Sequence, residues 1–334
     1  MREETVHLNG REEGEKAVVP DDPFVTRPFL EAASLLPPGR GRGFTLSARA
    51  GAATHHWGVV EMSRFGLKAA VAWAAPSGPP GSGRAAVWPS LLSAVADRGH
   101  AVLRMGSHST VRLGAADLAS IRSFAAEAGW RLRTSPFGTY VIDLRIPEEK
   151  RATLLERNHR QAVRKTDKAG MALARLDRAS LREFMRVSDE TYRRQGLEPH
   201  PRRYFEALID QPRSFRFYAA IDREGRHHAN AVIAVRGAHG IYLHGGSGHR
   251  DVPGAGVWLH WRIANDLAES GFTAYDLGGV DVTEAEGKAA GIRAFKARFG
   301  GVFERYEALD VVFRPRLDSA LRHALALARR LRLV

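Results

Sequence analysis

The chain has 334 residues, a formal net charge of +13 at pH 7 and no cysteine. This length is comfortable for two domains, and a hydrophobic content of 44% supports buried cores. The excess of positive charge favours a polyanionic partner: tRNA, another nucleic acid, a phosphorylated substrate or an anionic membrane surface. The absence of cysteine excludes thiol nucleophiles, disulfides and zinc–thiolate sites, and it fits a reducing cytoplasm.

No segment predicts a signal peptide or a membrane span. Residues 1–16 are charged throughout, and the longest apolar run, 69–76, is far too short to cross a bilayer. We therefore expect a cytoplasmic protein. No HExxH or other metal-ligand spacing is present, and neighbouring histidines on a strand, as in 55–56 and 227–228, point to opposite faces. We expect neither a metal nor a cofactor.

The first part of the chain predicts a mixed α/β domain after a disordered tail. Residues 1–19 carry five glutamates and almost no large apolar side chains, which indicates disorder. The cluster PSGPPGSG at 76–83 is a loop. The expected elements are strands from 44, at 59–60 and over 69–73, a helix over 88–98, a strand over 101–105, a helix over 115–128 and a strand over 139–144.

A similar succession follows, which suggests a duplicated fold, although the sequence itself contains no visible repeat. The expected elements are helices over 148–169, 180–194 and 201–209, strands over 215–221, 229–236 and 240–244, a helix over 257–270, a strand over 274–277, a helix over 290–299 and a strand over 308–313. An Arg-rich helix at 317–331 has an apolar stripe to bury. We expect a first domain over 20–147, joined by the terminal helix 315–334, and a second over 148–314.

The stretch 275–301 reads YDLGGVDVTEAEGKAAGIRAFKARFGG. It predicts a short strand ending in Gly278-Gly279, a loop, a helix that carries Phe295 and Lys296, and a glycine turn. A lysine fixed at the end of such a unit can stabilise an oxyanion without a metal or a cofactor. The alternative is an ordinary lysine on a helix surface, because lysines are mostly exposed.

The stretch 139–171 reads TYVIDLRIPEEKRATLLERNHRQAVRKTDKAGM. It predicts a strand followed by a helix on which four cations recur at intervals of three, four and four residues and share one face. These cations are Arg157, Arg160, Arg164 and Lys168. Such a row suits a phosphate backbone. The alternative is a solvated basic face, which is the more common case for a run of charges.

A third stretch, 242–256, places YLHGGS and then RDVPGAG ahead of a predicted helix. Glycines before a helix N-terminus offer backbone N–H groups to an anion. A coenzyme A acyltransferase of the GNAT type uses Arg/Gln-x-x-Gly-x-Gly at this point, but Arg250 lies one residue too far from Gly254. A plain turn between a strand and a helix is the alternative.

The stretches 139–171 and 242–301 resemble the Fem-type aminoacyl-tRNA-dependent transferases, the builders of peptidoglycan bridges. The resemblance lies in a Phe-Lys pair followed by a Phe-Gly turn, an IDL strand, a Glu-rich helix start, and a run in which Asn158 and Gly170 hold the family's positions. No long heptad insertion is present, so the chain resembles a compact form without a coiled-coil arm. The resemblance implies two tandem GNAT-like mixed α/β domains, with the C-terminal helix packed back on the first.

The resemblance also implies a site. Lys296 is then the partner of the oxyanion, and Phe295 lines the same site. The implied substrate-binding residues are Tyr242, His244, Gly278 and Gly279. The segment HPRRY at 200–204 can add phosphate contacts from Arg202, Arg203 and Tyr204. The cations Arg157, Arg160, Arg164 and Lys168 are expected to bind tRNA.

We therefore expect amide formation between the aminoacyl group of a charged tRNA and the amine of a small peptide or a natural-product (antibiotic) intermediate. A peptidoglycan precursor is the second candidate acceptor, because the family's N-terminal aromatic–lysine segment is not visible in 24–36. Two other functions stay open: a coenzyme A-dependent N-acyltransferase and a non-enzymatic RNA-binding protein. The Gly-Gly and Phe-Lys unit argues against the last, because RNA binding alone needs no buried lysine.

Overall fold

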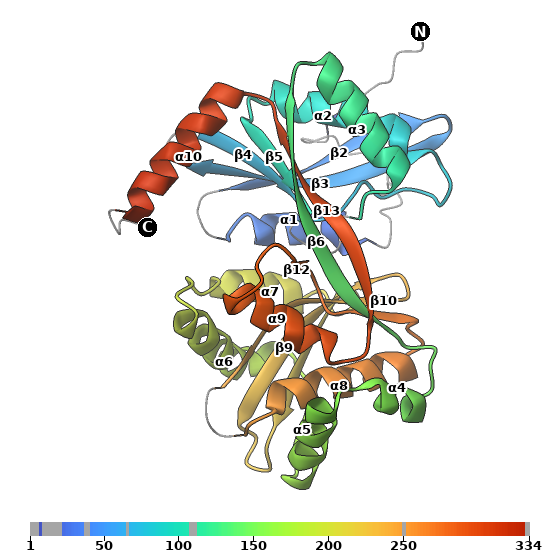
Figure 1. Ribbon diagram of the computed structural model, residues 1–334, viewed down its shortest axis with the longest axis vertical. Coiled ribbons are helices and arrows are strands. Elements are labelled where there is room, and N and C mark those ends of the chain that lie inside the picture. Colours follow the sequence, from blue (N-terminus) through green and yellow to red (C-terminus); the bar gives the residue numbers. More distant parts are fainter. Residues whose placement is uncertain are drawn as a thin grey trace. The chain divides into compact units, whose positions relative to one another are not determined.

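The structure, a computed structural model, describes residues 7–8, 22–36, 41–64, 67–106, 112–248 and 252–330 (Figure 1). It divides into two compact units, which are described separately. Unit 1 consists of Met1–Pro20, Phe24–Pro136 and Tyr306–Val334, and unit 2 of Asp21–Pro23 and Phe137–Arg305. Within the described ranges, no helix is both long enough and apolar enough to cross a membrane.

Unit 1 is a mixed sheet with helices packed on it. Its strands follow the order β1-β2-β3-β4-β5-β13, in which only β4 and β5 run parallel. The elements are β1 (His7–Leu8), α1 (Arg27–Ala33), β2 (Arg42–Ala50), β3 (Ala53–Arg64), β4 (Leu67–Ala72), α2 (Trp88–Asp97), β5 (Val102–Met105), α3 (Ala115–Glu127), β13 (Val302–Val312) and α10 (Pro315–Arg330).

The core of unit 1 forms because α2 and the strands turn apolar side chains toward each other. Leu91, Leu92 and Val95 recur at helical spacing on α2 and are fully buried. Trp57 of β3 meets Trp88 edge to face, with ring centroids 5.2 Å apart. Helix α2 therefore packs on the sheet through the face that its sequence periodicity predicts.

Unit 2 repeats this plan around a second parallel pair of strands. Its order is β6-β11-β10-β9-β8-β7, with β12 paired to β6, and β10 and β11 run parallel. The elements are β6 (Arg131–Asp143), α4 (Glu148–Leu154), α5 (Arg157–Lys168), β7 (Ala172–Arg175), α6 (Leu181–Arg194), α7 (Arg202–Ile209), β8 (Phe215–Ile221), β9 (His227–Arg236), β10 (His239–Ser247), α8 (Ala255–Glu269), β11 (Ala274–Asp276), β12 (Val280–Asp281) and α9 (Gly287–Ala297).

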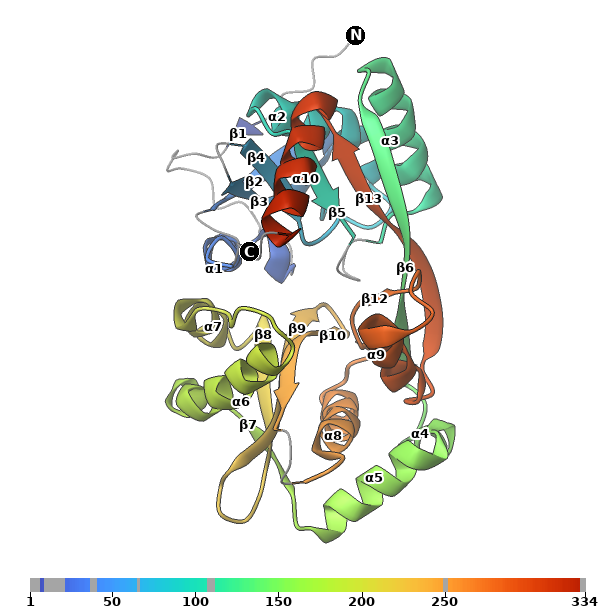
Figure 2. The same cartoon turned by 60° about the vertical axis from the view of Figure 1, so that its left-hand side comes forward.

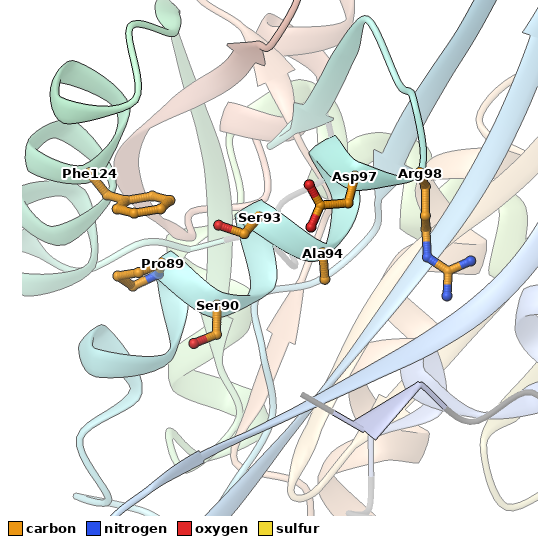
Figure 3. A pocket seen from close by; sticks show the side chains of 7 residues that line it. All are labelled: Pro89, Ser90, Ser93, Ala94, Asp97, Arg98 and Phe124. Atoms are coloured by element: carbon orange, nitrogen blue, oxygen red, sulfur yellow. The ribbon is translucent and has the colours of Figure 1, made fainter. Parts of the chain in front are cut away.

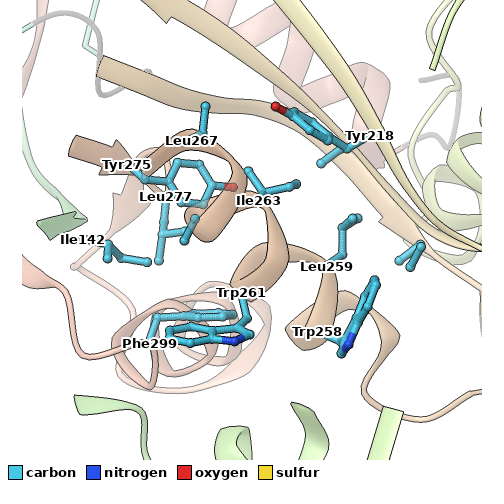
Figure 4. Packing of buried hydrophobic residues seen from close by; sticks show 14 of the residues in the cluster. Ile142, Tyr218, Trp258, Leu259, Trp261, Ile263, Leu267, Tyr275, Leu277 and Phe299 are labelled. Carbon is cyan, nitrogen blue, oxygen red and sulfur yellow. The ribbon is translucent and has the colours of Figure 1, made fainter. Parts of the chain in front are cut away.

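Both faces of the unit 2 sheet are covered, α6 and α7 lying on one face and α8 on the other (Figure 2). On the first face, Phe217 of β8 contacts Phe184 of α6 and Phe205 of α7. On the second face, Tyr218 of β8 joins a cluster built around α8 (Figure 4). Because successive strand residues alternate between faces, β8 and β9 are buried on both sides and read as nearly continuous apolar runs.

The two units exchange their closing strands. β6 follows α3 of unit 1, but its residues Val141–Asp143 pair with β11 of unit 2. β13 follows α9 of unit 2, but Leu309–Val312 pair with β5 of unit 1. The boundary therefore falls within β6, between Pro136 and Phe137, rather than at the expected residue 147. Both strands are also longer than expected, because each runs from one unit into the other.

Other elements differ from the expectations in detail. The single helix expected over 148–169 is two helices, because Leu155 and Glu156 are extended. The Glu156 N–H donates to the Arg298 carbonyl at 3.0 Å, which holds this break open. The disordered tail expected over 1–19 lies outside the described residues, except that His7 and Leu8 pair with β2. In unit 1, α10 is fixed by the ion pair of its buried Asp318 with Arg133 of β6.

Candidate active site

The site is built where two parallel strands of unit 2 part. β10 and β11 are paired only as far as Ile241 and Asp276. Beyond that point β10 continues to Ser247, whereas the chain after β11 turns at Gly278. Gly278 has φ +80°, and a Cβ there would lie 2.8 Å from the Tyr242 carbonyl oxygen. Only glycine fits both this backbone conformation and this close approach.

Lys296 of α9 points at this turn. Its ammonium donates to the carbonyl oxygens of Gly278 at 3.0 Å and Gly279 at 3.2 Å, and it lies 5.7 Å from the ring centroid of Tyr242. The side chain is buried. Burial lowers the pKa of Lys296 to about 8, and the nearby Asp276 carboxylate opposes this shift. Near neutral pH the lysine is therefore mostly cationic, and it loses its proton readily.

The turn that binds the lysine is held in place by hydrogen bonds with Asp276 and Thr139. Asp276 is buried and accepts hydrogen bonds from the Thr139 hydroxyl at 2.5 Å and from the Gly278 N–H at 2.8 Å. The Thr139 hydroxyl is also 2.9 Å from the Gly278 carbonyl oxygen. These hydrogen bonds orient the Gly278 and Gly279 carbonyls, and the carbonyls in turn position the Lys296 ammonium.

Phe295 packs behind the lysine. Its ring lies 5.5 Å from His159 of α5 and 5.8 Å from His260 of α8. Its carbonyl oxygen lies 3.1 Å from His159 Nε2. Burial, followed by the charge of Lys296 and by His159, lowers the pKa of His260 to about 3, so this ring is neutral. The rings of Phe295, His159 and His260 therefore pack together as an uncharged group next to Lys296 in the chain.

On the other face of β10, histidine and tyrosine side chains meet. A bulge between Tyr242 and His244 turns these residues to opposite faces of the sheet, because Tyr242 pairs with Ile233 and His244 with Val232. The Tyr204 hydroxyl lies 2.5 Å from His244 Nε2. Tyr204 is therefore fully buried within the protein, not exposed as a phosphate contact.

The remaining predicted residues lie elsewhere on unit 2. Arg202 and Arg203 begin α7 and are exposed, and Arg202 is paired with Glu206 at 2.8 Å. On α5, Arg157, Arg164 and Lys168 are exposed, whereas the guanidinium of Arg160 donates to the carbonyl oxygens of Thr153 and Leu155 and caps the end of α4. Of the four cations predicted to bind tRNA, Arg157, Arg164 and Lys168 are thus exposed on α5, and Arg160 supports the junction between α4 and α5.

The glycine stretch before α8 is described only from Val252 onward, so Arg250 lies outside the described residues. Gly254 precedes α8 with φ +97°, and a Cβ there would lie 3.0 Å from the Cβ of Ala162. Helix α5 therefore packs against the start of α8, where an acyl-coenzyme A loop would offer its N–H groups.

Sequence reasoning missed several residues that complete the site. Asp276 lies inside the motif YDLGG, next to the predicted glycines, and a carboxylate beside a candidate catalytic lysine is a signal that could have been used. Thr139 and His260 carry no such signal, because they reach the site from β6 and α8 only through the fold.

A separate hollow of about 600 Å³ lies on unit 1 (Figure 3). It is lined by residues of α2, by Arg98 and by Phe124 of α3, and it contains none of the predicted site residues. Among the residues with described positions, no three His, Cys, Asp or Glu side chains are grouped so that they could hold a metal ion.

Comparison with known proteins identifies the fold. Residues 155–297 match the family described as acetyltransferase (GNAT) domain, which covers the lysine, the turn and the histidine cluster. The chain as a whole has the Fem-type fold, with two tandem GNAT-like mixed α/β domains, as the motifs led us to expect. No curated protein matches the sequence.

The chain is similar to three solved structures over most of its length. FemX shares 14% identity with a TM-score of 0.67, covering 90% of this chain and 94% of FemX. L-PGS from Bacillus licheniformis shares 16% identity with a TM-score of 0.58, covering 93% of this chain and 97% of L-PGS. The C-terminal domain of a protein assigned as a lysylphosphatidylglycerol synthetase from Agrobacterium fabrum shares 17% identity with a TM-score of 0.58, covering 86% and 88%. At these identities the likeness establishes the fold.

Proposed function

We propose that the protein is an aminoacyltransferase of the cytoplasm. It moves the aminoacyl group of a charged tRNA to the amine of a small peptide or a natural-product intermediate, such as an antibiotic precursor, without a metal or a cofactor. The observation that carries this proposal is the Lys296 ammonium, buried and held by the Gly278 and Gly279 carbonyls where β10 and β11 part.

The reaction needs little beyond positioning and charge. The amine nitrogen attacks the ester carbonyl carbon, the C–N bond forms and the carbonyl oxygen becomes an anion. An ammonium has three N–H donors, and two of those on Lys296 are used by the glycine carbonyls. The third is left for the oxyanion. The C–O bond to the ribose then breaks, and the ribose oxygen gains a proton for the one that the amine loses.

The donor assignment rests on charge. The net charge is +13, and Arg157, Arg164 and Lys168 are exposed along one face of α5. Phosphate contacts by such side chains release counterions and make binding strongly dependent on salt. The packing of α5 against the start of α8 argues against a coenzyme A donor.

A coenzyme A-dependent N-acyltransferase is the second candidate, because residues 155–297 match a GNAT acetyltransferase domain. Calorimetry with a pool of charged tRNAs and with acetyl-coenzyme A separates the two. We expect salt-dependent binding of tRNA and weak or no binding of acetyl-coenzyme A. The reverse result rejects the tRNA donor.

The role of the lysine is tested by turnover with radiolabelled aminoacyl-tRNAs and a panel of amines and peptidoglycan precursors. Lys296→Ala should lower turnover roughly a hundredfold and leave tRNA affinity nearly unchanged. Lys288→Ala is the matched control, because Lys288 is an exposed lysine on the same helix. The proposal fails if both variants turn over like the parent.

A further inference from the structure

Asp276 is a buried carboxylate that takes no direct part in the proposed transfer. Its Oδ1 accepts two hydrogen bonds, from the Thr139 hydroxyl at 2.5 Å and from the Gly278 N–H at 2.8 Å. The carbonyl oxygen of the same glycine accepts a hydrogen bond from the Lys296 ammonium at 3.0 Å. One glycine residue therefore lies between the carboxylate and the ammonium and bonds to both.

This arrangement differs from an ordinary ion pair. Elsewhere in unit 2 the Asp266 carboxylate meets the guanidinium of Arg175 directly, at 2.8 Å. The Lys296 ammonium instead donates to two carbonyl oxygens, those of Gly278 and Gly279. A direct ion pair would take up an N–H donor of the ammonium. A carboxylate on the other side of a glycine supplies negative charge and leaves the donors to the carbonyls and the substrate.

The titratable side chains that reach the ammonium from other helices and strands are neutral. From β10, the Tyr242 ring lies 5.7 Å away, and burial raises the pKa of its phenol, which stays protonated. From α8, His260 is uncharged because burial lowers its pKa to about 3. Burial also lowers the pKa of His159 of α5, whose Nε2 lies 3.1 Å from the Phe295 carbonyl oxygen.

The charged neighbours on α9 itself are arginines with partners of their own. Arg293 donates to two backbone carbonyl oxygens, and Arg298 pairs with Glu156 at 3.4 Å. Among the described groups around the ammonium, Asp276 is the carboxylate that bonds to the same turn. Burial favours the uncharged amine of Lys296 and lowers its pKa, and the Asp276 charge acts against this.

We propose that Asp276 is a positioning residue of the transfer site: its carboxylate keeps Lys296 protonated across Gly278, and so keeps an N–H donor available to the oxyanion. The consequence for turnover rests on the proposed aminoacyl transfer, but the link between the two charges exists without a substrate. Thr139 has a different role, because its hydroxyl orients the carboxylate and carries no charge.

Asp276→Asn separates the charge from the shape of the turn. Both hydrogen bonds to Asp276 end on Oδ1, and an amide oxygen can accept the same two, so the variant keeps the turn while it loses the charge. Thr139→Val is the complementary variant, because it removes the hydroxyl and keeps the charge. Asp281→Asn is the matched control, because Asp281 lies in the next strand, β12, and its carboxylate accepts hydrogen bonds from Thr283 instead.

The protonation of Lys296 is measured by nuclear magnetic resonance on the whole protein with ¹³C-labelled lysine. The chain has seven lysines, so the Lys296 signal is assigned by its loss in Lys296→Met. It should titrate near pH 8 in the parent. Asp276→Asn should lower this midpoint by about one pH unit or more, and Thr139→Val and Asp281→Asn should change it much less. An unchanged midpoint in Asp276→Asn overturns the inference, whether or not the protein transfers an aminoacyl group.

Turnover tests the consequence, with hydroxylamine, a small amine that is uncharged at neutral pH, as the probe acceptor and a pool of charged tRNAs as donors. The ratio of Asp276→Asn to the parent is compared at pH 6 and pH 8, because any titration of the probe cancels in the ratio. If the midpoint falls from about 8 to about 7, this ratio should be about fivefold lower at pH 8 than at pH 6. A ratio that is equally low at both pH values overturns the inference, because lost shape rather than lost charge then explains it.

The outcomes keep the two proposals apart. If the parent forms no hydroxamate above the uncatalysed background with any charged tRNA, the aminoacyl transfer fails, while the lysine titration still decides whether Asp276 keeps the ammonium charged. If Asp276→Asn does not fold, the parent is titrated with ¹³C-labelled aspartate, assigned through the backbone. The Asp276 carboxyl signal must then move as Lys296 loses its proton near pH 8, and a signal that does not move rejects the link.

Discussion

The two units carry the same order of elements around a parallel pair of strands, but they use corresponding positions differently. The pair in unit 1 ends at Met105 of β5, and the pair in unit 2 ends at Asp276 of β11. Ala125 of α3 lies 20 residues beyond Met105, and Lys296 of α9 lies 20 residues beyond Asp276. All four are buried. At this distance along the chain unit 1 thus has two buried apolar side chains, where unit 2 has a carboxylate and a lysine.

The buried charges of unit 1 have a different character. Burial by itself would raise the pKa of Asp117, but hydrogen bonds from Arg84, Trp88 and the Gly114 N–H hold it below its ordinary value. Arg133 is paired with both Asp310 and Asp318. Such closed networks fix helices to strands. The Lys296 ammonium in unit 2 is held instead by two backbone carbonyls, which is the arrangement that the proposed site requires.

The largest effect is expected from moving the charge to the other unit. Ala125→Lys should lower the free energy of unfolding by roughly 3–5 kcal/mol, because an unpaired charge is buried where unit 1 has no prepared carbonyls. Urea unfolding measures this loss. Ala125→Met is the control for added volume, which costs about 1–3 kcal/mol. Equal losses in the two variants would show that charge at this position is tolerated in either unit.

The reverse change should stabilise unit 2. The pKa of Lys296 is about 8 in the folded protein and 10.5 ordinarily, so the unfolded chain binds more protons between these values. The free energy of unfolding of the parent should therefore rise with pH across that window, and the cost of burying the charge is complete below pH 8. Lys296→Met removes a cost of about 3 kcal/mol but leaves the Gly279 carbonyl without its donor.

Urea unfolding at pH 7 should thus find Lys296→Met more stable than the parent by about 2 kcal/mol, while turnover falls roughly a hundredfold, as in Lys296→Ala. The advantage should shrink as the pH rises from 8 to 10.5. A variant that is less stable than the parent at pH 7 would mean that the ammonium holds the turn together, as the ion pairs of unit 1 hold their helices.

The sequence predicted the elements of unit 2 better than their connections. The strand expected over 215–221 has the bounds of β8, because an apolar run between turn signals leaves little choice. The exchange of β6 and β13 was not predictable, since strand pairing depends on contacts far apart in the chain. The break at Leu155 and Glu156 contains no proline or glycine that could signal it. In the structure the Arg298 carbonyl, at the end of α9, accepts the Glu156 N–H.

The site was predictable where its residues share one motif. Lys296, Gly278 and Gly279 lie within one short stretch and meet as expected. Tyr204 was expected as a phosphate contact because it belongs to the stretch HPRRY, but the helical period turns Tyr204 inward and leaves Arg202 and Arg203 exposed. The hydrogen bonds of Tyr192 with His200 and His244 connect side chains that are far apart in the chain, which no spacing reveals.

A smaller effect is expected in acid, and again it should differ between the units. The pKa of His260 is about 3 in the folded protein against 6.5 ordinarily, chiefly because of burial. The unfolded chain therefore binds more protons between these values, and the free energy of unfolding falls as the pH drops below 6.5. His260→Gln should remove about 1.9 kcal/mol of the loss between pH 7 and pH 5, measured by urea unfolding.

His56 in unit 1 provides the comparison. Its pKa is also lowered, by burial and then by His55, but it is only half-buried and its Nδ1 bonds to Ser47 at 2.9 Å. His56→Gln should flatten the acid loss less than His260→Gln does. If His56→Gln reduces the acid loss of stability as much as His260→Gln or more, then unit 1 rather than unit 2 contains the acid-sensitive histidine.

The smallest effect on stability, and the sharpest on binding, is expected for Arg164. Its side chain is exposed on α5, so Arg164→Ala should change the free energy of unfolding by less than about 0.5 kcal/mol. It should weaken tRNA binding and lower the slope of log affinity against log salt by about one, with little effect on saturated turnover.

Arg160→Ala is a poorer probe, because Arg160 also supports the end of α4. Arg122→Ala on α3 of unit 1 is the control, since Arg122 is exposed and paired with Glu307 at 3.2 Å. If Arg122→Ala lowers the salt slope as much as Arg164→Ala, then tRNA binding depends on the net charge of the protein and not on the exposed cations of α5. The two units would then not differ in their contribution to tRNA binding.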